Sequence, residues 1–469
     1  MHTMPYDVLI VGSGASGGWV AKEAAERGLS VLMLEAGPPR VPTRDFTEHI
    51  WPYQLKFRGF GNQQQLLENQ PVQRLCYACD DYSHQFFVND HENPYTFPAA
   101  KPFMWIRGRQ VGGRTFCWAR ESYRFSDYDF RAASRDGYGE DWPIGYAELA
   151  PYYDRVERFI GVSGSREGLE QFPDGQFLPP MALSCGALLA RDVIGRKFGW
   201  RVMPDRVANL TVNHRGRPAC HYCDQCQRGC HTASYFNSPS VTLPAAFRTG
   251  RFTLVSDAVV SHVRIDSRGR AEGVHYIDRV SHRHREASAR VTVLAAGALD
   301  STRILLHSRS PLFSQGVGNE EGVLGHYLMD HFTVEGGGGL MRACARPRVT
   351  PLAARAASSF PTTRTWAPAE IPTSFVATAL TATAVRSSTV TRFCYRNSAT
   401  PGVRRYDKTF RTTSRWEPKA SACLVRRTTS LSIRNERTRG ASLLSTLSRA
   451  TARTRGRWPR RCGRTLARF

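Results

Sequence analysis

YDVLIVGSGASGG, residues 6–18, places a short apolar run directly before a glycine-rich turn. The run YDVLIV is typical of a buried parallel strand because it is apolar and rich in β-branched residues. Gly12, Gly14 and Gly17 then follow the pattern G-x-G-x-x-G. In a strand–turn–helix unit these glycines permit a tight turn, the close approach of a pyrophosphate, and close packing of the helix on the strand.

The residues after the glycines complete a βαβ unit. WVAKEAAERG has a helical composition, and Gly28 suits its C-cap. The next apolar run, LSVLMLE, ends at Glu35, 21 residues after Gly14. An acid there can accept hydrogen bonds from a ribose diol, and the helix N-terminus around Ser16 presents amide donors to phosphates. The sequence predicts an α/β dinucleotide-binding fold, and this motif alone leaves FAD and NAD both open.

Charge is distributed very unevenly along the 469 residues. Residues 1–342 hold 38 Lys and Arg against 36 Asp and Glu, whereas residues 343–469 hold 26 against 4. Ser, Thr and Arg make up 58 of the 127 positions in the second part, which has no clear apolar period. The net charge of +24 therefore belongs to a basic tail, and the first part has the charge balance of an ordinary globular protein.

Composition also bears on the compartment. Twelve cysteines in 469 residues do not indicate a disulfide scaffold. The N-terminus has no signal-peptide pattern, and no run of about twenty apolar residues occurs. We expect a cytoplasmic protein without a transmembrane segment, while export to the periplasm together with a partner subunit remains an alternative.

Four cysteines crowd the stretch CHYCDQCQRGC, residues 220–230. Their spacing, C-x2-C-x2-C-x3-C, is that of a bacterial ferredoxin loop, although His231 stands where the ferredoxin run continues with Pro. An iron–sulfur cluster, a zinc ion and a loop of reduced thiols without metal are the three interpretations that these residues leave open. The candidate ligands are Cys220, Cys223, Cys226 and Cys230.

Further motifs follow in a fixed order. They are GRQVGG at 108–113, DWPIGYAELAPYY at 141–153, AAGALDSTRILLHS at 295–308 and GVLGHYLMDHF at 322–332. With them, residues 5–340 resemble the glucose–methanol–choline (GMC) family of flavin oxidoreductases. The resemblance implies FAD rather than NAD in the dinucleotide site, and an antiparallel substrate-binding sheet beside the flavin domain.

The resemblance also implies roles for individual residues. The GRQVGG loop would run along the flavin, the backbone of Val260 would meet the adenine, and the backbone at Ala296 would contact the cofactor. Trp118 stands where many members have Asn, which resembles the branch that acts on sugars and sugar acids, such as gluconate dehydrogenase flavoprotein subunits. The predicted cofactor-binding residues are Gly12, Gly14, Ser16, Gly17, Glu35, Arg109, Gly112, Gly113, Val260, Ala296 and Gly297.

This branch includes flavoprotein subunits with an iron–sulfur cluster set by three cysteines at the separations of Cys220, Cys226 and Cys230. Such a cluster would pass electrons from reduced FAD to a cytochrome or a small-subunit partner. The implied reaction oxidises the CH–OH group of a small alcohol, sugar or sugar acid, with hydride passing to flavin N5 and electrons leaving to an acceptor other than oxygen.

Two interpretations compete for the basic tail. One is an arm that binds nucleic acid or an anionic surface, which would be the alternative function of the chain. The other, which we favour, is a shifted reading frame, because the composition changes inside a recognisable domain rather than after a completed fold. Family members carry a catalytic His near the C-terminus, and no histidine follows His331 here. We therefore expect no nucleic-acid partner and a catalytically incomplete chain, and we assign no catalytic residue.

Together these observations predict an α/β protein with a Rossmann-like FAD-binding domain and an incomplete antiparallel-sheet substrate domain. The predicted organisation is a first part of the FAD-binding domain at 1–160, a cap or substrate-domain segment at 161–210, the second part of the FAD-binding domain with the cysteine loop at 211–330, the start of a substrate-domain segment at 331–342, and the tail at 343–469.

Overall fold

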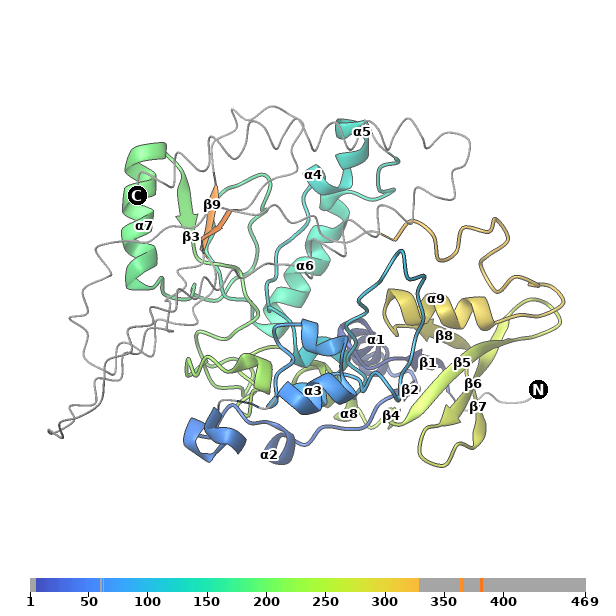
Figure 1. Ribbon diagram of the computed structural model, residues 1–469. Helices are drawn as coiled ribbons and strands as arrows, with labels where there is room; N and C mark the ends of the chain where they lie inside the picture. The colour runs from blue at the N-terminus through green and yellow to red at the C-terminus, as the bar shows by residue number, and fades with distance from the viewer. Residues whose placement is uncertain are drawn as a thin grey trace, which may run out of the picture.

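The computed structural model describes residues 6–59, 61, 63–137, 139–328, 363–366 and 380–382 (Figure 1). The predicted α/β class is confirmed, with a parallel sheet, flanking helices and antiparallel sheets. The predicted segment 331–342 and nearly all of the tail 343–469 lie outside the described residues. The frame-shift and nucleic-acid interpretations of the tail therefore stay predictions.

A four-stranded parallel sheet is the central layer of the described part. Its strands are β1 (Val8–Val11), β2 (Val31–Leu34), β4 (Phe252–Val255) and β8 (Val291–Leu294), in the order β4-β2-β1-β8. Every residue of β1 and β2 is buried. This agrees with the continuous apolar runs of the sequence, because a parallel sheet covered on both faces needs apolar side chains on each of them.

Helices cover one face of this sheet. The helices are α1 (Ala15–Glu26), which follows β1 directly, and α8 (Thr242–Phe247). Ile10 and Met33 point into this layer and are fully buried. They share a core with residues of both helices, namely Ala21, Ala24, Ala25, Leu243 and Ala246.

An antiparallel sheet and a helix cover the other face. The sheet has the order β5 (Ala258–Ile265), β6 (Ala271–Asp278) and β7 (His284–Ser288), and the helix is α9 (Ala298–His307). Leu9 and Leu32 point into this layer, where they pack with Val260, Val274 and Ile304. Because it packs on the parallel sheet, this antiparallel sheet belongs to the dinucleotide-binding unit and is not the implied substrate-binding sheet.

The segment between β2 and residue 120 is made of loops and short helices around an aromatic cluster. The rings of Phe46, Phe86 and Phe116 lie 5.4–5.8 Å apart, centroid to centroid. The helices are α2 (Pro42–Asp45), η1 (Pro52–Gln54), η2 (Lys56–Gly59), α3 (Gln63–Asn69), η3 (Gln73–Leu75), η4 (His84–Phe86) and η5 (Gly113–Phe116).

Most of the remaining elements lie beside this unit in Figure 1, and the last helix of this group packs on α8. They are α4 (Asp127–Phe130), α5 (Ala132–Asp136), α6 (Tyr146–Ile160), α7 (Cys185–Phe198), β3 (Arg201–Met203), η6 (Cys226–Arg228) and η7 (Ser238–Ser240). A second antiparallel sheet has the order β10-β9-β3 and includes β9 (Thr363–Trp366) and β10 (Leu380–Ala382). The predicted domain boundaries stay predictions.

Among the described residues, no helix is both long and apolar enough to cross a membrane.

Candidate functional site

Two glycines of the turn after β1 are required by close packing. Gly12 has φ of +99°, and a Cβ there would lie 2.5 Å from the carbonyl oxygen of Ala295 at the end of β8. A Cβ on Gly17 would lie 1.9 Å from the carbonyl oxygen of Gly12. No side chain fits at either distance, so the junction of β1, α1 and β8 needs glycine at both positions.

Gly14 differs from its two neighbours in the motif. No heavy atom lies within 4 Å of the place where its Cβ would be. Helix α1 begins at Ala15, and Ala15 and Ser16 are exposed. The first amides of a helix have no partner within the helix, and they lie at the positive end of its dipole. Open space beside such amides suits a pyrophosphate.

Glu35 is fixed at the end of β2, next to this turn. It is buried, and its Oε2 accepts hydrogen bonds from the Ser13 N–H at 3.0 Å and the Ser13 hydroxyl at 2.6 Å. Its Oε1 accepts from the Gly37 N–H at 3.0 Å. Burial raises the pKa of Glu35, although these hydrogen bonds favour the ionised form. The carboxylate therefore lies where the ribose of a dinucleotide would approach.

The predicted flavin loop lies directly against the glycine turn. A Cβ on Gly113 would lie 3.4 Å from the Cα of Gly14, and the Gly112 N–H donates to the Ser13 hydroxyl at 2.8 Å. Gly112 has φ of +97°, and a Cβ there would lie 2.6 Å from the Cδ of Pro239. The structure thus brings together two motifs that lie about a hundred residues apart in the sequence.

Arg109 braces the same loop from the side. Its guanidinium donates to Oδ1 of Asn93 at 2.6 Å and lies 3.9 Å from a carboxylate oxygen of Asp300, which is in the first turn of α9. Its backbone passes so close to Gly37 that a Cβ on Gly37 would lie 2.1 Å from the Arg109 carbonyl oxygen. Arg109 therefore joins the loop to the ends of β2 and α9.

The last three predicted residues lie at the edge of this arrangement. Ala296 and Gly297 connect β8 to α9, and Gly297 is exposed, with no heavy atom within 4 Å of its Cβ position. Val260 is 3 % exposed in β5, and its carbonyl accepts a hydrogen bond from Arg303 at 3.3 Å. The predicted contacts of all three with the cofactor stay predictions.

The family assignment rests on a match that covers most of the chain. The family model described as GMC oxidoreductase matches residues 6–333. The chain belongs to the GMC oxidoreductase family. FAD is the cofactor of this family. The open position at Gly14, the exposed start of α1 and the fixed carboxylate of Glu35 fit its ADP half.

Curated relatives are similar over about the same stretch. Paromamine 6'-oxidase of Streptomyces fradiae is 29% identical over 330 residues, covering 69% of this chain and 53% of that protein. The fructose dehydrogenase large subunit of Gluconobacter japonicus is 26% identical over 335 residues, covering 70% and 59%. The 2-methyl-1,2-propanediol dehydrogenase of Mycolicibacterium austroafricanum is 29% identical, covering 69% and 55%. The chain spans about half the length of the curated relatives it matches.

Among solved structures, pyridoxine 4-oxidase from Mesorbium loti matches with a TM-score of 0.40 at 20% identity, covering 65% of this chain and 52% of that one. A formate oxidase variant from Aspergillus oryzae matches with a TM-score of 0.38 at 14% identity, covering 66% and 48%.

The four cysteines of 220–230 are free thiols. Burial raises the pKa of Cys220 and Cys226, and raises that of Cys223 to about 12. Within the described residues, no three of their sulfur atoms lie within 4.8 Å of one another. This spacing does not fit a single zinc ion, which would hold its sulfurs closer together. A cluster places several iron and sulfide atoms between its thiolates, so the iron–sulfur interpretation stays a prediction.

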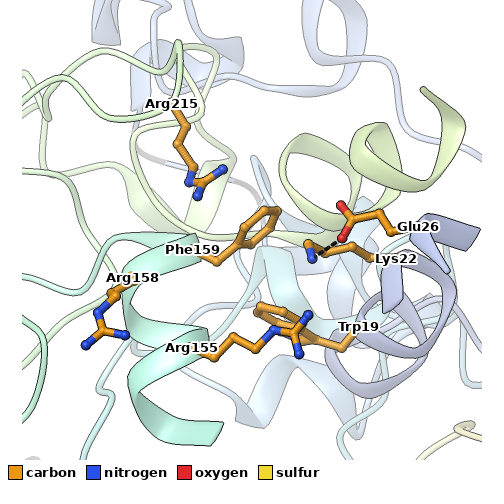
Figure 2. Close-up of a pocket in the computed structure, with 7 residues that line it drawn as sticks. All are labelled: Trp19, Lys22, Glu26, Arg155, Arg158, Phe159 and Arg215. Carbon is orange, nitrogen blue, oxygen red and sulfur yellow. Dashed lines mark hydrogen bonds and ion pairs between the residues drawn. The ribbon is translucent and has the colours of Figure 1, made fainter. Parts of the chain in front are cut away.

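A separate basic hollow of about 500 Å³ lies between α1 and α6 (Figure 2). Its cations are largely partnered: Lys22 donates to Glu26 at 2.7 Å, and Arg155 lies 2.5 Å from a carboxylate oxygen of Glu23. Because it faces the later turns of α1, it does not include the glycine turn. The lining residues are Trp19, Lys22, Glu26, Arg155, Arg158, Phe159 and Arg215.

Sequence reasoning missed several residues that hold the site together. Ser13 lies inside the quoted motif, yet the pattern treats it as a variable position. The Ser238 hydroxyl donates to the Gly14 carbonyl at 2.9 Å, and its N–H donates to the Thr115 hydroxyl at 3.2 Å. Ser238 follows Gly14 by more than two hundred residues, so no local signal could have indicated this contact.

Proposed function

We propose that this chain binds FAD at the carboxyl ends of β1, β2 and β8. The observation that carries this proposal is the convergence at Gly14. The position beside Gly14 is open, the exposed start of α1 follows it, and Gly113 packs against the Cα of Gly14. Ser16 and the neighbouring amides would face the pyrophosphate, Glu35 would accept from the ribose, and the 109–113 loop would border the flavin.

The proposed activity is that of the whole family protein, namely oxidation of a CH–OH group in a small alcohol, sugar or sugar acid. FAD, when bound, would supply the acceptor for a hydride from the carbinol carbon, and a base would take the hydroxyl proton. The relatives whose names state a substrate support this class, since those substrates are paromamine, fructose and a propanediol. The described residues serve this reaction by binding and orienting the cofactor.

We further propose that this chain completes no turnover by itself. Residues 332–469 contain no histidine. A counterpart of the catalytic His that family members carry near the C-terminus is therefore missing from these residues. The decisive measurements are therefore FAD binding first and flavin reduction second.

The test uses the purified full-length chain. It is dialysed with excess FAD, and the flavin that remains bound is measured by its absorbance and by release on denaturation. We expect about one FAD per chain, and a protein that retains none would overturn the FAD proposal. Anaerobic addition of fructose, gluconate or a diol should then leave the bound flavin oxidised. Bleaching by any of them would disprove the inactivity while leaving FAD binding intact.

The finer proposal concerns the route of electrons. We propose that Cys220, Cys226 and Cys230 hold an iron–sulfur cluster, with Cys223 as a fourth ligand or a free thiol, that passes electrons to a small-subunit or cytochrome partner. The name of one relative, a fructose dehydrogenase large subunit, supports a partner. Iron and acid-labile sulfide in anaerobically purified chain, with a low-temperature EPR signal lost in the Cys226→Ser variant, would support the cluster. Absence of iron and sulfide would overturn it.

A further inference from the structure

A second group of metal-capable side chains lies outside the thiols of 220–230 and the dinucleotide site. Glu48 and His49 follow α2, and His231 follows the last cysteine of the 220–230 loop. One ligand atom from each of the three residues lies within 4.8 Å of the other two. We propose that Glu48, His49 and His231 bind one divalent ion of the zinc class, which cross-links these two segments.

Burial of Glu48 is the first argument for a cation. The Glu48 side chain is 1% exposed, and within the described part of the chain no Lys or Arg forms an ion pair with it. Its Oε1 accepts the backbone N–H of His231, and its Oε2 lies 3.4 Å from Nδ1 of His49. A buried carboxylate is costly without a paired charge. A bound divalent ion would supply that charge at the oxygen that faces the imidazole.

The two imidazoles supply the other ligands. The rings of His49 and His231 lie 5.1 Å apart, centroid to centroid, at an angle of 51°. The His49 side chain is 43% exposed, so an ion can enter from solvent. Zinc accepts imidazole nitrogen and carboxylate oxygen at about 2.0–2.2 Å, so small rotations of these exposed rings complete the set. Water would take the fourth position.

The site is distinct from the neighbouring cysteines. The sulfur of Cys230 accepts hydrogen bonds from the N–H of Ser234 at 3.2 Å, and Cys230 is buried. His231, in contrast, is exposed. Consecutive residues therefore direct their ligand atoms to different surroundings. The ion would thus have nitrogen and oxygen ligands only.

The surrounding contacts show what the ion would hold. The Thr47 N–H donates to the Arg228 carbonyl at 3.1 Å. Gly229 has φ of +100°, and a Cβ there would lie 2.3 Å from the Phe46 ring. The two segments are thus already held side by side next to the three ligands, so binding of an ion needs little rearrangement. An ion would tie the cysteine loop to the segment after α2.

The test is a Co²⁺ titration of the full-length chain after treatment with chelator and reductant. Co²⁺ held by imidazoles and a carboxylate gives weak visible bands without the intense near-ultraviolet band of a thiolate ligand. We expect one equivalent to bind with this spectrum and Zn²⁺ to displace it. His231→Ala should weaken binding at least about tenfold. His221→Ala, a matched histidine from the cysteine loop, should bind like wild type.

Glu48→Gln is the second variant. It retains an oxygen acceptor for the His231 N–H but removes the anionic ligand, so the fold should persist while Co²⁺ affinity falls at least about tenfold. Zn²⁺ should also raise the melting temperature of wild type and of His221→Ala, but not that of Glu48→Gln. Unchanged affinity in both site variants, no nitrogen- and oxygen-type Co²⁺ spectrum, or a spectrum with thiolate bands at the first equivalent would overturn the proposal.

Discussion

Gly14 and Gly17 belong to one glycine motif, yet only Gly14 has room for a side chain. A Cβ at Gly17 would lie 1.9 Å from the Gly12 carbonyl oxygen, whereas a Cβ at Gly14 would meet open space. The backbone at Gly14 is extended, with φ of −65°, which alanine can adopt. Packing of the fold therefore explains one glycine, and the approach of a ligand is left to explain the other.

This contrast gives a paired prediction. Gly17→Ala should lower the free energy of unfolding by about 1–3 kcal/mol or more, because the new methyl forces β1 and α1 apart. Gly14→Ala should leave the melting temperature of the FAD-free chain close to that of wild type while weakening FAD binding about tenfold or more, a loss of about 1.4 kcal/mol. Thermal melts and FAD titrations of both variants check this, and unchanged FAD affinity in Gly14→Ala would contradict the pyrophosphate site.

Glu35 predicts a pH dependence. Its pKa is raised by burial from the ordinary value of 4.5. Ionisation of Glu35 therefore opposes folding. The protonated side chain contributes to the free energy of unfolding in full below the unfolded-state pKa, and this contribution is lost as pH rises through the folded-state pKa. Relative to Glu35→Gln, the melting temperature of FAD-free wild type should rise as pH falls toward about 4.5. The exposed Glu140→Gln serves as control. A difference between wild type and Glu35→Gln that is constant with pH would contradict the raised pKa.

Local sequence was sufficient to place some of these residues in the fold and not others, and their contacts with a cofactor stay predictions. Gly12, Gly14, Gly17 and Glu35 could be predicted because strand, turn, helix and strand follow one another without interruption, so each glycine has a place in a known geometry. Glu48 could not be predicted as a candidate metal ligand. Its proposed role depends on the nearness of His231, far along the chain, and on the burial of its side chain, which composition does not reveal.

At the scale of elements, α6 is fixed by a buried cluster of charges. Arg124 donates to Oδ1 of Asp154 at 2.5 Å, and to Oε1 and Oε2 of Glu157 at 2.8 and 2.5 Å. The side chains of Arg124 and Glu157 are only 3% and 5% exposed. Glu157 also accepts the Gln176 N–H at 2.7 Å, so the cluster links α6 to the 174–178 segment.

Removing one partner of this cluster should be costly. Arg124→Met leaves the Glu157 carboxylate buried without its cation, and we expect a loss of about 3–5 kcal/mol in the free energy of unfolding. Arg44, whose side chain is 68% exposed and lies 2.7 Å from Asp45, provides the control, and Arg44→Met should cost less than about 1 kcal/mol. Denaturant melts of both variants measure the difference, and equal losses would contradict the assigned role of the buried cluster.

Element prediction was accurate where apolar period and neighbouring turns agreed. The strands β1 and β2 were predicted close to their observed bounds, and the helix α1 was predicted between them. The antiparallel strands β5, β6 and β7 and their packing on the parallel sheet were not predicted from the sequence. That packing depends on which face of β5 carries Val260, a choice that alternating residues in a partly buried strand do not settle.

At the scale of the whole molecule, charge and cofactor site are separate. The net charge is +24, and residues 343–469 contribute +22 of it. If the basic tail binds polyanions, the binding should depend steeply on salt, whereas FAD held by glycine packing and buried hydrogen bonds should not. Retention of the chain on heparin should fall sharply between about 50 and 200 mM salt, with bound FAD unchanged. Release of flavin in the same salt range would contradict the prediction that polyanion binding by the tail and FAD binding are independent.

The position of β8 has a consequence for the nascent chain. Val8 pairs on one side with Val31 and on the other with Val291. At a synthesis rate of about 5–20 residues per second, β1 waits roughly 14–57 s for its second neighbour after it has been made. Throughout that time one edge of an entirely apolar strand has unpaired backbone groups. Such an edge can pair with strands of other chains and aggregate. Covering β1 until β8 has been made would prevent such pairing, so the yield of folded protein depends on events during synthesis as well as on the finished fold.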